Sequence, residues 1–371
     1  MKTIYFVAGE ASADNHGAAL MRSLRKAEAD VRLIGRGGPQ MKSVAGEDFK
    51  NWIEQSGVLG LSEVIKDYGY FRKQFRETLG EIETNKPGAV VLIDYPGFNL
   101  RLARALRKQS PSQKIIYYIS PQVWAWNRGR IKKMARWLDL MLCIFPFEAD
   151  LYNQSGLRTI FVGHPMVERL GDRKINIPRD SNLIGLFPGS RVREIRKIFP
   201  ILIKTARELH RSKPNLRFEI AAASDDLARE IENMLSSEDP QLFEVKVGQT
   251  AEIMQRAYVG IVASGSATLE AACFRMPFVL IYKVSSLTYA AGRLLVKVKY
   301  LGMPNVLAEK EIVPEFIQHR AKPSAITQAV SRLLELGPRT EMISEFDKVR
   351  EQLGGRGASE RAAKAILAEI G

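Results

Sequence analysis

The feature that constrains this chain most is a repeated alternation of short apolar runs with helical patterns. Amphipathic segments such as 99–108 and 148–154 separate runs rich in β-branched and aromatic residues, which occupy 3–9, 31–37, 89–94, 114–120, 140–145 and 159–164. Strands that alternate with helices in this way are typical of βαβ units and a parallel sheet. The first half of the chain therefore predicts an α/β domain.

The same alternation begins again in the second half of the chain. A polar, proline-containing stretch at 175–182 precedes apolar runs near 182–190, 217–223, 244–248, 259–265 and 277–283. The 371 residues exceed the roughly 250–300 at which one hydrophobic core stops growing. We therefore predict two Rossmann-like, doubly wound parallel-sheet domains rather than one barrel. From about Ser324 the pattern predicts consecutive helices, with a glycine-rich break before the last one.

Composition excludes several classes of protein. With 46% hydrophobic and 26% charged residues, the chain is neither disordered nor collagen-like. Its two cysteines exclude a disulfide framework and a cysteine-type zinc site. The first apolar run is too short for a signal peptide, and no long uncharged apolar stretch predicts a transmembrane helix.

The charge balance indicates an anionic partner. The 55 Lys and Arg against 41 Asp and Glu give a net charge of +14. Nucleic acid, acidic lipid and a phosphorylated substrate are all compatible with that charge. The RRM, KH and zinc-finger signatures are missing, so we expect no nucleic acid as partner.

Two carboxylates follow strands in the first half. Ligands of open α/β sheets bind beyond the carboxyl ends of the strands, where Glu10 and Asp94 lie. Asp94 precedes a Pro-Gly turn and is placed to take a proton from a substrate hydroxyl. The alternative is that it caps the next helix, for which Asn99 is the better candidate. For Asp14, just beyond Glu10, helix capping is the simpler interpretation.

Two strand-to-helix junctions in the second half suit an anion. Ser190 and Arg191 follow a Pro-Gly pair and offer a hydroxyl, backbone N–H groups and a guanidinium, although this is not a P-loop. Ser266 and Thr268 lie at the second junction, and Glu270 one turn further could accept a ribose hydroxyl. Helix capping is the alternative for the two hydroxyls. Together the junctions predict a nucleotide diphosphate site.

Aromatic and basic residues cluster in two places. Trp124 and Trp126 follow a strand, and they predict either a wall for a ligand or core packing. The basic run over 128–136 comes next, and it predicts either a solvated helix face or an anion-facing patch. Residues 58–75 mix apolar, aromatic and basic side chains, which suits a membrane interface, with a core element as the alternative.

Missing motifs narrow the chemistry. The sequence has no D-x-D, HExxH, G-x-S-x-G or GxGxxG motif, and its four histidines are far apart. A metal-centred reaction therefore has no evident ligands, and we expect neither a metal nor a cofactor.

Taken together, these segments resemble lipid-A-disaccharide synthase, a bacterial family of two-domain GT-B glycosyltransferases (family 19). The resemblance covers nearly the whole chain through VAGEASAD, GRGGPQM, IDYPGFN, SPQVWAW, FPFE, VGHP, PGSR, ASGSATLE and PNVLA. Ala13 and Arg36, the latter in the first glycine turn, depart from the family pattern. These departures concern loop details.

The resemblance implies an inverting, metal-independent hexosyltransferase that joins UDP-2,3-diacylglucosamine to 2,3-diacylglucosamine 1-phosphate through a β-1,6 bond. Two domains would face a cleft: residues 1–169 for the acceptor and the membrane, and 170–342 for the UDP-sugar. Helices of 343–371 would pack back on the first domain. Asp94 would be the general base with Glu10 nearby. Glu270 would hold the ribose, and the diphosphate would be held by Arg191, Ser190, Ser266, Thr268 and Asn305.

The same resemblance implies a cytoplasmic protein bound peripherally to the anionic inner membrane. The sequence leaves the oligomeric state open, and an oligomer is compatible with it. The alternative function is that of a GT-B-like UDP-sugar epimerase. Such an enzyme would use the same UDP site but would need no apolar surface for acyl chains.

Overall fold

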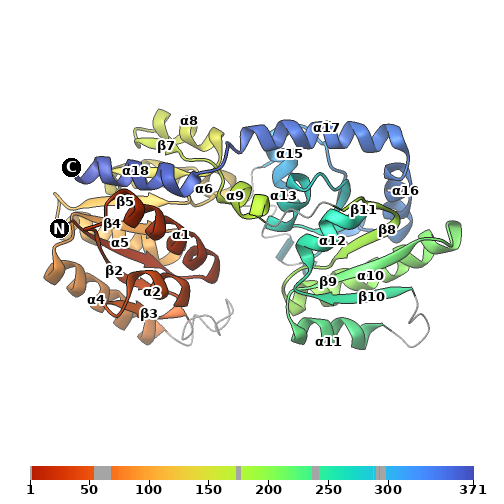
Figure 1. Cartoon of the computed structure of the whole chain (residues 1–371), viewed down its shortest axis with the longest axis horizontal. Helices are drawn as coiled ribbons and strands as arrows, with labels where there is room; N and C mark the ends of the chain where they lie inside the picture. The colour runs from red at the N-terminus through yellow and green to blue at the C-terminus, as the bar shows by residue number, and fades with distance from the viewer. Residues whose placement is uncertain are drawn as a thin grey trace. The chain divides into compact units, whose positions relative to one another are not determined.

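The computed structural model of the chain describes residues 2–53, 68–172, 177–235, 242–286, 288–289, 292 and 298–371. The chain forms two compact units, one made of Met1–Pro165 with Leu353–Gly371 and the other of Met166–Gln352 (Figure 1). Each unit contains a parallel sheet with helices on its faces. The predicted pair of doubly wound α/β domains is therefore confirmed.

The described sheet of the first unit has the order β3-β2-β1-β4-β5-β6-β7, with every neighbouring pair parallel. All of its strands except β3 coincide with apolar runs of the sequence. The strands are β1 (Thr3–Ala8), β2 (Arg32–Gly37), β3 (Phe49–Asn51), β4 (Ala89–Ile93), β5 (Lys114–Tyr118), β6 (Leu140–Cys143) and β7 (Thr159–Phe161).

Helices cover this first sheet, and the last helix of the chain joins them. It packs against the first helix and the fifth strand, so the two ends of the chain meet in one unit (Figure 1). The helices are α1 (Ala11–Ala27), α2 (Pro39–Ala45), α4 (Tyr68–Asn85), α5 (Pro96–Gln109), α6 (Val123–Trp126), α7 (Gly129–Trp137), α8 (Pro146–Gln154) and α18 (Ala358–Ile370).

The central strands of the first sheet are buried on both faces. Every residue of β4 is buried, and so are nearly all residues of β1 and β5. Near-continuous β-branched and aromatic runs are what a sheet covered by helices on both sides requires, because neither face contacts water. The apolar runs of the sequence therefore form the core, and the polar residues after them lie at the sheet's carboxyl edge.

The second unit repeats this plan. Its described sheet has the order β10-β9-β8-β11-β12-β13, again all parallel. The edge strand β13 did not stand out in the sequence. The strands are β8 (Asp180–Phe187), β9 (Arg217–Ala222), β10 (Phe243–Val247), β11 (Ala257–Ala263), β12 (Phe278–Tyr282) and β13 (Glu315–Ile317).

The helices of the second unit end in two that pack on one another, α16 and α17, and α17 also contacts α13 and α15. The glycine-rich residues after α17 separate it from α18, as predicted. The elements are α9 (Pro165–Asp172), α10 (Val192–Ser212), α11 (Asp225–Met234), α12 (Thr250–Arg256), α13 (Ser266–Cys273), α15 (Met303–Ala308), the 3-10 helix η1 (Gln318–Arg320), α16 (Pro323–Leu333) and α17 (Leu336–Gln352).

The strand order of each sheet reverses at one central pair. In the first unit β1 lies beside β4, with Ala8 opposite Ile93. In the second unit β8 lies beside β11, with Phe187 opposite Val262. Chain connections leave such a pair in opposite directions, which opens a crevice at the carboxyl ends where ligands of this fold bind. The residues that follow these four strands are therefore the candidates for a ligand site.

Among the described residues, none of the helices combines the length and apolar character needed to cross a membrane.

Candidate active site

The first unit presents Glu10 and Asp94 at its reversal point. Glu10 follows β1 and is exposed at the start of α1, whereas Asp94 follows the neighbouring strand β4 and is half-buried. Burial, together with the negative charge of Glu10, raises the pKa of Asp94 to about 6. A carboxylate with such a pKa is ionised at neutral pH and is a better proton acceptor than an ordinary aspartate.

The backbone of Asp94 is held in an uncommon conformation. Its φ is 46°, and that of Tyr95 is 48°, in the left-handed region that side chains usually avoid. Three hydrogen bonds fix it: the Asp94 N–H donates to the Tyr118 carbonyl at 3.0 Å, and its carbonyl accepts from the Asn99 amide at 2.8 Å and from the Tyr117 hydroxyl. The backbone polar groups are thus engaged inside the protein. Strain that the surroundings hold in place is typical of functional sites.

Asn99 does not have the predicted capping role. Helix α5 begins at Pro96, with Tyr95 in the N-cap position, so Pro96 and Gly97 belong to the helix rather than separating it from Asp94. The Asn99 side chain instead donates back to the carbonyls of Ile93 and Asp94. It positions the candidate base, a role that spacing alone does not reveal.

Aromatic rings support the turn that carries Asp94. Trp52, which comes from a separate segment after β3, lies edge-on to Tyr95 and Phe98 at ring-centroid distances of 6.4 and 5.1 Å. Its indole N–H donates to the Ala8 carbonyl at 2.6 Å. A Cβ on Gly9 would lie 2.2 Å from the Tyr95 ring, so only glycine fits there. Sequence analysis gave no signal for Trp52, because it contacts the site only through the fold.

Asp14 caps a helix, but not its own. Its buried carboxylate accepts hydrogen bonds of 2.9 Å from the backbone N–H groups of Gly38, Gln40 and Met41. These are unpaired donors of the first turn of α2, which a carboxylate stabilises. The acidic motif after β1 therefore contains one structural carboxylate, Asp14, and one exposed carboxylate, Glu10.

Arg36 lies within β2, because the strand continues to Gly37. The prediction that Arg36 belongs to a glycine turn is therefore wrong. Its buried guanidinium forms ion pairs with Glu77 and Glu81 of α4. Burial opposes ionisation of Glu81, but hydrogen bonds from Arg36 and Lys50 outweigh it and lower the pKa of Glu81 to about 2. This departure from the family pattern thus anchors α4 to the sheet.

Glu148 of α8 is a buried carboxylate that contacts the tryptophan motif. It accepts hydrogen bonds from the Ser120 hydroxyl at 2.5 Å and the Trp124 indole at 2.9 Å. Burial raises the pKa of Glu148 to about 7 despite these donors. Trp124 is thereby a core residue, whereas Trp126 is 40% exposed. Core packing therefore describes Trp124, and a ligand wall at Trp126 stays a prediction.

The reversal point of the second unit carries a cavity of about 320 Å³. Its lining includes Ser190 and Arg191 after β8 and Ser266 after β11, so the two predicted junctions meet there. Gly189 and Gly265 have φ values of 115° and 151°, which side chains rarely adopt. Hydroxyls, backbone N–H groups and a guanidinium converge on this cavity, as an anion requires.

Glu194 also lines this cavity, although the sequence did not single it out. Its carboxylate accepts from the Arg191 guanidinium at 2.9 Å and from the Ser190 N–H at 3.3 Å. Both donors are groups that a diphosphate would use. Glu194 therefore holds the Ser190–Arg191 segment in place. In the sequence, its link to the site is its position three residues after Arg191, in the first turn of α10.

Two residues predicted to contact the diphosphate point their polar groups into the protein. Thr268 is fully buried and its hydroxyl donates to the Gly265 carbonyl at 2.8 Å. The Asn305 amide donates to the Val313 carbonyl and to Glu315, and accepts from the N–H groups of Ile312 and Val313. These bonds use the full capacity of the Asn305 side chain. Neither residue lines the cavity described above.

Glu270 lies one turn into α13, with its side chain 13% exposed and an Arg169 guanidinium 3.9 Å from its carboxylate. Of the predicted membrane segment, residues 58–67 lie outside the described residues. On α4, Phe71 and Phe75 are half-buried against the core of the first unit, whereas Arg72, Lys73 and Arg76 are exposed.

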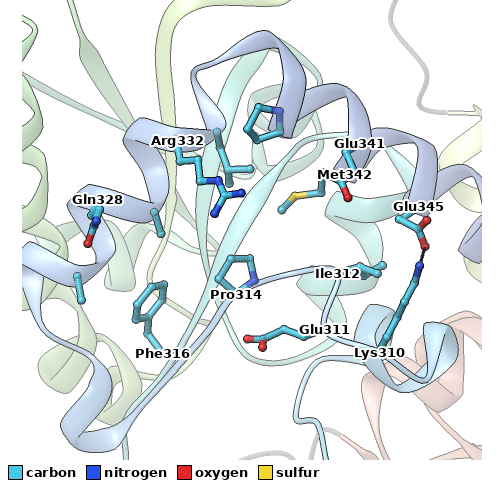
Figure 2. Close-up of a pocket in the computed structure, with 14 residues that line it drawn as sticks. Lys310, Glu311, Ile312, Pro314, Phe316, Gln328, Arg332, Glu341, Met342 and Glu345 are labelled. Atoms are coloured by element: carbon cyan, nitrogen blue, oxygen red, sulfur yellow. Dashed lines mark ion pairs between the residues drawn. The ribbon is translucent and has the colours of Figure 1, made fainter.

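A further cavity of about 660 Å³ contains none of the predicted site residues (Figure 2). It lies beside β13 between α16 and α17, where Lys310 and Glu345 form an ion pair of 2.8 Å across one end. Apolar Pro314 and Phe316 line the other side. Its place at the sheet edge, away from the strand-order reversal, separates it from the candidate site.

Within the described ranges no group of three or more His, Cys, Asp or Glu side chains is arranged to hold a metal ion.

Solved structures share this fold at low sequence identity. The S. aureus MnaA–UDP co-structure gives a TM-score of 0.65 at 15% identity and covers 99% of this chain and 96% of that chain. The calicheamicin glycosyltransferase gives 0.60 at 14% identity, covering 100% and 98%. A UDP-GlcNAc 2-epimerase from Neisseria meningitidis gives 0.60 at 13% identity, covering 99% of each chain. The fold is thus that of the GT-B glycosyltransferases, and the epimerase likeness extends to the fold alone.

The sequence comparisons specify the family. A family model described as lipid-A-disaccharide synthetase matches residues 4–370. Lipid-A-disaccharide synthases of Geobacter sulfurreducens and Legionella pneumophila are 37% and 36% identical to this chain, each covering 99% of it and 97% of the relative. The chain belongs to the lipid-A-disaccharide synthase family and is a glycosyltransferase.

Proposed function

We propose that this protein transfers 2,3-diacylglucosamine from UDP to the 6-hydroxyl of 2,3-diacylglucosamine 1-phosphate, forming the β-1,6-linked lipid A disaccharide 1-phosphate. Family membership supports the reaction. The observation that carries the assignment of roles is the contrast between the two reversal points. One presents a carboxylate with a raised pKa and the other an anion-suited cavity.

In this proposal Asp94 is the general base. The acceptor oxygen O6 attacks C1 of the donor sugar while the Asp94 carboxylate takes the O6 proton. The bond from C1 to the diphosphate oxygen breaks, and UDP leaves with its electron pair, so the configuration at C1 inverts. Glu10 tunes the base, because its charge favours the protonated form of Asp94.

The second unit holds the UDP moiety. Arg191, the Ser190 N–H and hydroxyl, and Ser266 bind the diphosphate and stabilise the charge that grows on it as the bond breaks. Diphosphate binding displaces the Glu194 carboxylate from Arg191. Thr268 acts indirectly, since its hydroxyl holds the carbonyl of Gly265 beside the cavity. Asn305 holds backbone at Ile312 and Val313, outside this cavity. Glu270 accepts a ribose hydroxyl.

The acyl chains of both substrates place the reaction at a membrane surface. We propose that the exposed side of α4 faces the anionic inner membrane from its cytoplasmic side. The exposed cations Arg72, Lys73 and Arg76 and the net charge of +14 support this. Each cation near an anionic surface contributes about 1 kcal/mol.

The test is to incubate the protein with UDP-diacylglucosamine, with and without the acceptor, and to analyse the products by mass spectrometry. We expect disaccharide 1-phosphate and UDP only when both substrates are present. Formation of an epimeric UDP-sugar without acceptor would support the epimerase alternative instead.

A further inference from the structure

A basic pocket lies between α5 and α7 of the first unit. Its volume is about 200 Å³, and it is lined by Arg101 and Arg104 from α5 and by Arg130 and Lys133 from α7. Each helix thus contributes two cations spaced three residues apart, which places them on one helix face. Leu100 and Trp137 add apolar surface to the same pocket, and no carboxylate belongs to its lining.

The cations of this basic pocket differ in pairing from Arg107, the next cation along α5. Arg107, one turn beyond Arg104 on α5, pairs with Asp139 at 2.6 Å and donates to the Trp137 carbonyl. In the described part of the chain, no ion pair involves any of the four pocket cations. Arg130 has only a ring beneath it, the exposed indole of Trp126 at 4.8 Å. Like charges gathered without a counter-charge repel each other, and a bound anion would relieve that repulsion.

The position of the basic pocket relates it to the candidate base. Pro96 and Gly97 also line it, and Pro96 is two residues after Asp94. Two peptide steps span at most about 7.6 Å between Cα atoms. In a hexosamine 1-phosphate, O6 and the phosphate are carried by one sugar ring. When O6 is at the base, the phosphate must therefore lie within one sugar's length of it.

We propose that the basic pocket binds the phosphate of the acceptor lipid, an assignment that rests on the proposed function. Guanidinium groups bind phosphate oxygens in pairs, which suits Arg101 and Arg104. The apolar surface of Leu100 and Trp137 suits the sugar face or acyl chain beside that phosphate. The anionic headgroup of a bilayer lipid carries the same chemistry, so the test must separate the two sources.

The test compares two acceptors in detergent micelles: diacylglucosamine 1-phosphate and the same lipid without its phosphate. The variants are R104Q, K133Q and R104Q/K133Q. The control is K132Q/R136Q, which removes two exposed cations of α7 outside the pocket. We expect R104Q/K133Q to lower kcat/KM about tenfold or more for the phosphorylated acceptor and to leave the dephosphorylated one nearly unchanged. The control should match the wild type, and all variants should bind UDP and melt alike.

Each other outcome is decisive. If R104Q/K133Q keeps the wild-type preference for the phosphorylated acceptor, the assignment is overturned. A double variant that loses only binding to phosphatidylglycerol vesicles, with the micelle preference intact, would assign the pocket to bilayer headgroups and overturn it as well. If the wild type forms no disaccharide from either acceptor, the proposed function fails first. If wild type forms disaccharide and only the preference is unaffected, the function stands and the pocket assignment alone fails.

Discussion

The carboxyl edges of the two sheets share one topology but carry opposite chemistry. At the reversal point of the first unit the chain presents carboxylates, Glu10 and Asp94, whereas at that of the second it presents Ser190, Arg191 and Ser266. In the proposed function the first edge accepts a proton and the second binds an anion. The fold fixes where a site can form, and the few residues after each strand decide its chemistry.

The backbones of the two edges also differ in which residues have a positive φ. Left-handed positions near the anion cavity are glycines, Gly189 and Gly265, which have no side chain to keep a ligand away from the backbone. At the reversal point of the first unit the left-handed positions are Asp94 and Tyr95, both with side chains. If the Asp94 carboxylate is the general base, glycine cannot replace it, and the first edge must retain the strain.

Replacing Asp94 should remove the chemistry of the first edge and spare the second. We expect D94A to lower kcat by about 10² to 10⁴, the usual contribution of a general base. UDP affinity, measured by calorimetry, should stay at the wild-type value. Normal turnover by D94A would move the base elsewhere, with Glu10 as the next residue to test.

Replacing Arg191 should weaken the anion site of the second edge and spare the carboxylate of the first. Loss of a charge-assisted pair with phosphate should weaken UDP binding by roughly 1.5–3 kcal/mol, about 10- to 150-fold. K204A, which removes an exposed cation further along α10, is the matched control. Unchanged UDP affinity in R191A would remove this residue from the site.

The pH dependence should follow the first edge. Because Asp94 must be ionised to accept a proton and its pKa is about 6, kcat/KM should fall about tenfold per pH unit below 6. E10Q removes a negative charge that raises this pKa, so its acidic limb should shift to lower pH. A limb that stays in place in E10Q would show that Glu10 does not act on the base.

The buried carboxylates of the first unit should support the fold and not the reaction. D14A leaves three backbone donors of α2 without their acceptor, and each buried donor left unpaired costs about 1–3 kcal/mol. Urea unfolding should show this loss in D14A, with kcat per folded molecule close to wild type. A large loss of kcat at unchanged stability would instead assign Asp14 to the active edge.

The smallest expected effect is that of a chelator. If Arg191 and the helix N-termini stabilise the leaving UDP, EDTA should leave kcat within experimental error of the untreated enzyme. A strict requirement for added Mg²⁺ would show that the anion site of the second unit is incomplete without a cation.

Local pattern was sufficient to predict the two α/β units and most of their strands. Strand and helix periodicities depend on near neighbours in the chain, so they can be recognised in a single sequence. The three-residue strands β3 and β13 were not predicted, because neither begins a longer apolar run, whereas the equally short β7 does. The motifs sufficed to identify the family, which the comparisons confirmed.

Which polar side chains bond inside the protein depends on the folded chain. The sequence predicts a cap at Asn99 and ligand contacts at Thr268 and Asn305, yet each side chain hydrogen-bonds to backbone inside the protein. Trp52 supports Asp94 from a segment some forty residues away. The raised pKa of Asp94 likewise depends on burial and on Glu10 across the β1–β4 pair. Hydrogen bonding, burial and charge depend on neighbours in space, and the sequence by itself specifies those only through the completed fold.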